Sequence, residues 1–72
     1  MTELVNYIVT ALVDNKDEVS VKEDGDVITV KVAKDDIGKI IGKQGRIIKS
    51  IRSVVKAAAA KQGKNCSVEI DE

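Results

Sequence analysis

The sequence lacks histidine, proline, tryptophan and phenylalanine, and its 72 residues include one tyrosine and one cysteine. A single thiol cannot form an internal disulfide, and without histidine it cannot assemble a metal cluster unaided. We therefore expect no metal and no other cofactor. Cys66, in a segment where apolar and polar residues alternate, is predicted to be a small buried side chain.

The sequence also has few residues that could form a catalytic site. The cysteine has no evident base beside it, and the glycines fit neither Gly-x-x-x-x-Gly-Lys-Ser/Thr nor Gly-x-Gly-x-x-Gly. Asp35 and Asp36 are a conceivable metal or acid–base pair, but the capping of a helix accounts for them more simply. The chain is accordingly predicted to bind rather than to catalyse.

Long apolar segments are missing as well. No run approaches the roughly 18 residues that cross a bilayer, and the N-terminus has neither the basic start nor the apolar core of a signal peptide. We expect no membrane association and a cytoplasmic location. The length indicates one small domain over residues 1–72. Such domains bury only about 60% of their unfolded surface, so dimerisation would add stability.

The formal net charge is zero, but the charges are separated along the chain. Residues 34–64 hold nine basic side chains against two acidic ones, whereas residues 1–33 carry a net charge of −4 and residues 65–72 one of −3. A basic region on an otherwise acidic body can steer a polyanion to one surface. Runs of charge also occur on faces that are simply solvated. The charge alone therefore favours neither a polyanion-binding surface nor a solvated face.

The period of the apolar residues changes along the chain. Residues 2–13 show helical spacing, residues 18–23 and 27–33 alternate as strands do, and Asp24-Gly25 between them is typical of a hairpin turn. Asp35 or Asp36 is expected to cap a short helix ending at Ile41. A longer helix is predicted over 46–62, and strand-like alternation returns at 66–71.

The long helix has an apolar stripe with the spacing of a core-facing surface and basic residues opposite to it. The expected core residues are Ile47, Ile48, Ile51, Val54, Val55 and Ala58. Each predicted strand has one apolar face, so the three strands should form a single sheet covered on one face by the three helices. The predicted fold class is α+β, with two layers and the order α-β-β-α-α-β.

The segment Ile40–Ile48 carries the most specific signal. Gly42 falls where the short helix must end, in a left-handed conformation that glycine adopts without steric cost. Gly45 opens the following helix, and Lys43 and Gln44 form a two-residue tip between the glycines. Because neither glycine has a side chain, a phosphate could approach the main chain and the free N–H groups of the next helix.

This segment resembles the signature of the K-homology (KH) domain, an apolar pair followed by Gly-x-x-Gly and an apolar residue two positions later. The matching residues are Ile40, Ile41, Gly42, Gly45 and Ile47. The element order is similar to that of the type II KH fold, and the length and Gly-Lys-x-Gly loop resemble small bacterial single-KH proteins of the KhpA type. For the glycines alone, a tight helix-turn-helix connection without a ligand is the alternative.

The resemblance implies a protein that clamps the backbone of about four nucleotides of single-stranded RNA, with single-stranded DNA left open as a ligand. It further implies an RNA-chaperone or post-transcriptional role, a link to cell-wall homeostasis and cell shape, and pairing with itself or with a larger KH protein of the KhpB type. The predicted RNA-binding residues are Ile37, Gly38, Lys39, Ile41, Gly42, Lys43, Gln44, Gly45, Arg46 and Lys49.

The bases are expected to lie in an apolar groove with Ile37, Gly38 and Ile41 on one wall and the strand Ile28–Val32 on the other. Ile37 and Ile41 fit plain core packing equally well. Gly38 has a second explanation, close contact with a neighbouring helix, since a glycine inside a helix costs about 1 kcal/mol relative to alanine. With Tyr7 as the only aromatic residue, the base stacking of RRM and OB folds is excluded.

A protein-interaction module that keeps the KH shape and binds little RNA of its own is the competing interpretation. The intact glycines and Lys43 count against it, because a chain that had lost RNA binding would have no need of a basic loop. Gln44 stands where many KH loops carry glycine or a basic residue, yet its amide can still donate a hydrogen bond.

Overall fold

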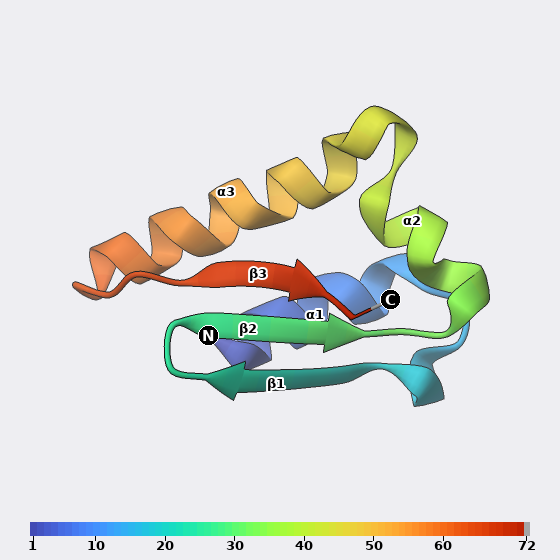
Figure 1. The fold of residues 1–72 in the computed structure, drawn as a ribbon, viewed down its shortest axis with the longest axis horizontal. Helices are drawn as coiled ribbons and strands as arrows, with labels where there is room; N and C mark the ends of the chain where they lie inside the picture. The colour runs from blue at the N-terminus through green and yellow to red at the C-terminus, as the bar shows by residue number, and fades with distance from the viewer. Residues whose placement is uncertain (72) are drawn as a thin grey trace.

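The apolar periodicities correspond to three helices and three strands in the computed structural model, which describes residues 1–71. The elements are helix α1 (Thr2–Leu12), strands β1 (Ser20–Asp24) and β2 (Val27–Lys31), helices α2 (Ile37–Ile41) and α3 (Arg46–Lys61), and strand β3 (Ser67–Ile70). Figure 1 shows them in chain order. The predicted order α-β-β-α-α-β is confirmed, with each boundary within a few residues of its expected place.

The strands form one mixed sheet in the order β1-β2-β3. β1 and β2 are antiparallel and joined by the predicted hairpin turn, whereas β3 is parallel to β2, with Val68 opposite Ile28. β2 is therefore the central strand, and β3 is an edge strand that lies next to α3 (Figure 1). The parallel pairing follows from the two helices that connect β2 to β3, because they return the chain to the end at which β2 began.

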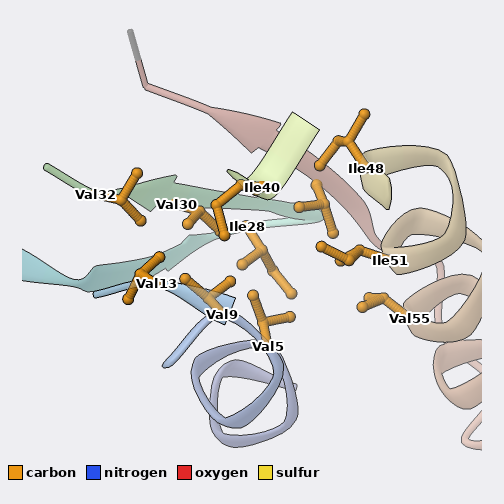
Figure 2. Close-up of a cluster of buried hydrophobic side chains, with 11 residues drawn as sticks. Val5, Val9, Val13, Ile28, Val30, Val32, Ile40, Ile48, Ile51 and Val55 are labelled. Carbon is orange, nitrogen blue, oxygen red and sulfur yellow. The ribbon is translucent and has the colours of Figure 1, made fainter. Parts of the chain in front are cut away.

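The core lies between the helices and one face of the sheet. Figure 2 shows side chains from α1, β2, α2 and α3 converging there. Among the most deeply buried are Val5, Val9, Ile28, Val30, Ile40 and Val55. The opposite face of the sheet is polar, with exposed Lys22 and Glu69. The two-layer α+β fold with all helices on one side of the sheet is thus confirmed, and it is the arrangement of a type II KH domain.

The core-facing stripe of α3 is narrower than predicted. Its buried residues are Ile48, Ile51, Val55 and Ala59. Val54, which was assigned to the core, is 50% exposed, and Ile47 is only partly buried. The prediction was wrong for Val54 because an apolar stripe gives the direction of the core but not its width, which depends on how closely α1 packs beside α3.

Candidate nucleic-acid interface

The turn between α2 and α3 contains three residues with positive φ. They are Gly42 (φ 75°, ψ 176°), Gln44 (φ 59°, ψ 24°) and Gly45 (φ 74°, ψ 16°). The Gly42 conformation is essentially restricted to glycine. Its N–H donates to the Gly38 carbonyl at 2.8 Å and closes the last turn of α2. Gly42 therefore ends the short helix with positive φ, and Gly45 lies at the N-cap of α3, as predicted.

The two glycines differ in how strongly the fold requires them. A Cβ atom at Gly42 would lie 2.5 Å from Cγ1 and 2.8 Å from Cβ of Ile47. A Cβ atom at Gly45 would have its nearest neighbour, Cγ2 of Ile48, at 3.9 Å. Gly42 is thus required by both its backbone conformation and its packing, whereas Gly45 is required by conformation alone.

The tip of the loop is exposed and basic. Lys43, Gln44 and Arg46 are all exposed, and Nη2 of Arg46 donates to Oε1 of Gln44 at 3.1 Å. No side chain caps the N-terminus of α3, so its first N–H groups and the positive end of the helix dipole add to the same region. The loop can thus present main-chain donors, one amide and two cations to an anion.

Lys39 has a different environment from the other predicted basic contacts. Among residues 1–71, the only ion pairs within 4 Å join the Lys39 ammonium to Asp14 and to Asp36, the latter at 3.1 Å. Lys43, Arg46 and Lys49 have no such partner in this part of the chain. The cations at the loop are therefore available to a ligand, whereas a ligand would have to compete with two carboxylates for Lys39.

Asp36 does not cap α2 as predicted, because its side chain makes no capping hydrogen bond. The carboxylate is fully buried and accepts hydrogen bonds from the main-chain N–H of Asn15 at 3.0 Å, from Nδ2 of Asn15 at 3.1 Å and from the N–H of Asp14 at 3.3 Å. The physical reason is the number of donors: the turn after α1 supplies three N–H groups, and Lys39 adds its ammonium at 3.1 Å.

These hydrogen bonds, led by that from the main chain of Asn15, lower the pKa of Asp36 from its ordinary 3.8 to about 2, although burial opposes the change. Because folding lowers this pKa, the stabilisation is present above about pH 4 and is lost as the pH falls toward the folded-state pKa. At neutral pH the Asp36 carboxylate ties α2 to the turn that follows α1. It thereby fixes the helix that leads into the loop.

Gly38 lies on an open side of α2. A Cβ atom built there meets nothing within 4 Å, so the explanation by close contact with a neighbouring helix is wrong. Ile37 and Ile41 beside it are partly buried and pack against the core. A mid-helix glycine that faces open space leaves the main chain of α2 accessible next to the loop, which is where the sequence predicted one wall of a groove.

The other predicted wall, the strand Ile28–Val32, is wrong for Ile28 and Val30 but includes Lys31 and Val32, which line a pocket beside Ile37. Ile28 and Val30 in β2 are 0% exposed and cannot line an open groove, because they point to the face of the sheet that the helices cover. The pocket beside Ile37 extends toward the ends of the strands. It is lined by Glu18, Lys31, Val32, Ala33, Lys34, Ile37 and Asp71. The structure therefore offers the ends of β2 and β3, rather than the middle of β2, as the surface opposite α2.

A second hollow, here called the apolar groove, lies between α1 and α3. Its lining residues are Leu4, Tyr7, Ile8, Leu12, Arg46, Ile47, Ser50, Ile51 and Val54. Tyr7 is 77% exposed and Val54 is 50% exposed. The sequence did not predict this surface, because the apolar spacing of α3 placed Val54 in the core. The available signal was the width of the apolar stripe on α3, which exceeds what the core covers.

Other site types find no support in the described residues. Residues 1–71 hold no group of three or more side chains that could bind a metal ion. None of their helices is long and apolar enough to cross a membrane. Cys66 is a free thiol that is partly, not fully, buried.

Comparison with known proteins gives one consistent family. The family described as KhpA/KhpB, KH domain matches residues 2–70. RNA-binding protein KhpA of Caldanaerobacter subterraneus subsp. tengcongensis is 54% identical, over 97% of this chain and 99% of the relative. The proteins of the same name from Clostridium perfringens (50%; 97% and 99% covered) and Chlamydia trachomatis (46%; 100% and 97% covered) are also similar. No solved structure gives a significant match.

Proposed function

Because the chain belongs to the KhpA/KhpB family of KH domains, we propose that it binds single-stranded RNA, with the loop Gly42–Gly45 clamping the sugar-phosphate backbone. The observation that carries this proposal is the shape of the loop. Two glycines and Gln44, all with positive φ, form a tight turn directly before the uncapped N-terminus of α3. This is a site where a phosphate can reach main-chain N–H groups.

In this mechanism the backbone of the RNA crosses the loop. Lys43 and Arg46 supply positive charge, and Gln44 supplies an amide. The Gln44–Arg46 hydrogen bond positions both side chains on the exposed surface of the loop. Lys39 contributes by holding α2 through Asp14 and Asp36, since a direct contact with RNA would cost it these ion pairs.

The bases then lie along the open side of α2. Gly38 allows a base to approach the main chain, Ile37 and Ile41 offer aliphatic contact, and the pocket beside Ile37 supplies charged groups at its rim. Few contacts on one small domain give weak binding with limited sequence discrimination. Such a clamp suits an RNA chaperone or a post-transcriptional regulator in the cytoplasm that acts on many RNAs.

The apolar groove favours self-association as the way to strengthen this weak binding, because a second domain raises the effective concentration. The lining of the groove contains Arg46 as its one charged residue and is otherwise largely apolar. Tyr7 is 77% exposed and Val54 is 50% exposed there, so a second copy could bury both side chains. In a two-fold dimer α1 of one copy would face α3 of the other. A larger KH protein presenting a similar face would compete for the same groove.

The clamp is tested with Lys43→Asp combined with Gln44→Asp, measured as binding to short unstructured RNA across a salt series. Aspartate tolerates the left-handed backbone of residue 44, so the fold should be retained in circular dichroism and thermal melting. The matched control is Lys64→Asp with Asn65→Asp, which makes the same charge change in an exposed loop elsewhere.

We expect the loop variant to lose at least about 100-fold in affinity, since it replaces attraction to several phosphates by repulsion. The control should stay within a few-fold of the unmodified chain. Equal losses in the two variants would mean that net charge alone matters, and unchanged affinity in the loop variant would overturn the clamp.

A further inference from the structure

One flank of α3 carries a row of cations that begins near the clamp at Lys49 and extends beyond it. Lys49, Arg52 and Lys56 are spaced by three and four residues, so they lie on one side of the helix, and all three are exposed. This row, here called the basic flank, is on the side of α3 away from Ile47 and Val54. No acidic residue occurs between Arg46 and Lys61.

Arg52 is held in place at the edge of the sheet. Its Nε donates to the Val68 carbonyl of β3 at 3.0 Å. The N–H of Ser67 donates to the carbonyl of Asp26, just before β2, and the N–H of Asp71 donates to the carbonyl of Val30 in β2. The main-chain groups of Val68 between them therefore point to the free edge of β3. Arg52 thus occupies an otherwise open strand edge, while four of the five guanidinium N–H donors remain for another acceptor.

The charges of the basic flank are not neutralised by ion pairs within the part of the fold that the structure describes. Within residues 1–71, none of the three side chains has a carboxylate within 4 Å, unlike Lys39. Lys16 provides a second contrast, because its ammonium is taken up by the carbonyls of Thr10 and Val13. Arg52 is anchored between Lys49 and Lys56, and neither lysine has a carboxylate partner among the described residues. An extended polyanion would neutralise these three charges.

We propose that the basic flank continues the phosphate-binding path of the clamp, so that the chain binds RNA longer than the clamp alone requires. This proposal rests on the proposed RNA binding. The path begins at Arg46 beside the loop and runs along α3 to Lys56, a distance of about 15 Å at the rise of an α-helix. The additional contacts are to phosphates, so they add affinity and reach without reading sequence.

The test compares binding of a four-nucleotide and a ten-nucleotide oligouridine by the full chain and by two double variants. Lys49→Gln with Lys56→Gln removes the two lysines of the basic flank. Lys22→Gln with Lys61→Gln removes the same charge from exposed positions on β1 and on the other side of α3. A longer RNA also gains affinity by offering more binding registers, and this statistical gain is common to all three proteins.

We expect four-nucleotide binding to change by less than about twofold in the control variant. In the flank variant it should fall by a smaller factor than ten-nucleotide binding, because Lys49 is itself a predicted RNA-binding residue close to the loop and Lys56 is not. For the ten-nucleotide RNA, the flank variant should bind about tenfold more weakly than the control variant. The slope of log affinity against log salt should fall by about 1.4, because each phosphate contact to a single strand contributes about 0.7. If the two double variants have the same affinity and salt slope on the longer RNA, the proposed role of the basic flank is contradicted. The proposed clamp is not affected by that result.

Arg52 is tested separately because it also contacts β3. Arg52→Lys keeps the charge and loses the bond to the Val68 carbonyl, whereas Arg52→Gln loses both. If Arg52 binds phosphate, the salt slope is retained in Arg52→Lys and falls in Arg52→Gln on the ten-nucleotide RNA. If its role is only to cover the strand edge, both variants lower thermal stability and leave the slope unchanged, which would remove Arg52 from the path.

Discussion

The two exposed flanks of α3 differ in chemistry although they belong to one helix. The flank beside β3 is basic, with Lys49, Arg52 and Lys56, whereas the flank beside α1 is apolar, with Ile47 and Val54 over the apolar groove. The third side of the helix is core. The amphipathic pattern of α3 thus includes two separate exposed surfaces. One is suited to a polyanion and the other to another protein. Their separation predicts that RNA binding and self-association can be removed independently.

The clamp and the apolar groove meet at Gly42, which belongs to the clamp and lies against Ile47 in the lining of the groove. Gly42→Ala should therefore damage both, with a loss of about 2–4 kcal/mol in unfolding free energy from backbone strain and overpacking. Gly45→Asn, which keeps a tolerated left-handed residue, should cost about 1 kcal/mol or less. Chemical denaturation measures both. A Gly42→Ala protein as stable as Gly45→Asn would contradict the packing described for the loop.

The apolar flank alone is removed by Val54→Asp. A charge in the centre of an apolar interface should weaken self-association by about 100-fold, measured by sedimentation at micromolar concentrations. Ser53→Asp introduces the same charge one residue away, outside the groove lining, and should leave the dimer intact. Four-nucleotide RNA binding should be unchanged in Val54→Asp. If the unmodified chain sediments only as a monomer at these concentrations, the proposed self-association is contradicted.

The salt concentration should affect RNA binding and self-association differently, so the two surfaces can be distinguished without any mutation. With about four phosphate contacts, RNA affinity should fall about 50-fold between 50 and 200 mM salt. Self-association through apolar contacts should change by less than about threefold over the same range. Parallel salt series on the two equilibria give the comparison directly, and equal salt dependence would show that the surfaces are not chemically distinct.

Gly38→Ala is the mildest change and acts in opposite directions on folding and binding. Alanine at this open helical position should raise the unfolding free energy by about 0.5–1 kcal/mol. It should also weaken RNA binding by about 3–10-fold if a base approaches the main chain there, with self-association unaffected. Thermal melting and RNA titration of one sample suffice. A more stable protein with unchanged RNA affinity would place the bases elsewhere.

The sequence predicted what depends on local chemistry. The element order follows from apolar periods, and the shape of the loop follows from Gly42 and Gly45, because the conformational freedom of glycine is a local property. The sheet with helices on one face follows from strands that are each apolar on one side. The turn Gly42–Gly45 could therefore be placed before the structure was known.

Features that depend on distant parts of the chain could not be predicted. Asp36 has its hydrogen-bond donors on Asp14 and Asn15, 22 and 21 residues away, so the local sequence predicts only a helix cap. The exposure of Val54 depends on the packing of α1 beside α3. The position of β2 at the centre of the sheet depends on its parallel pairing with β3, and no apolar pattern encodes strand order.

The most direct test of the account is an NMR titration of the isotope-labelled full chain with a short unstructured RNA, following every backbone amide. The account predicts that the largest shift changes fall on Gly42–Arg46 and Gly38, with smaller changes at Lys49 and none at Tyr7 or Val54. Changes concentrated on Tyr7 and Val54, or on the open face of the sheet, with the loop amides unmoved, would contradict it.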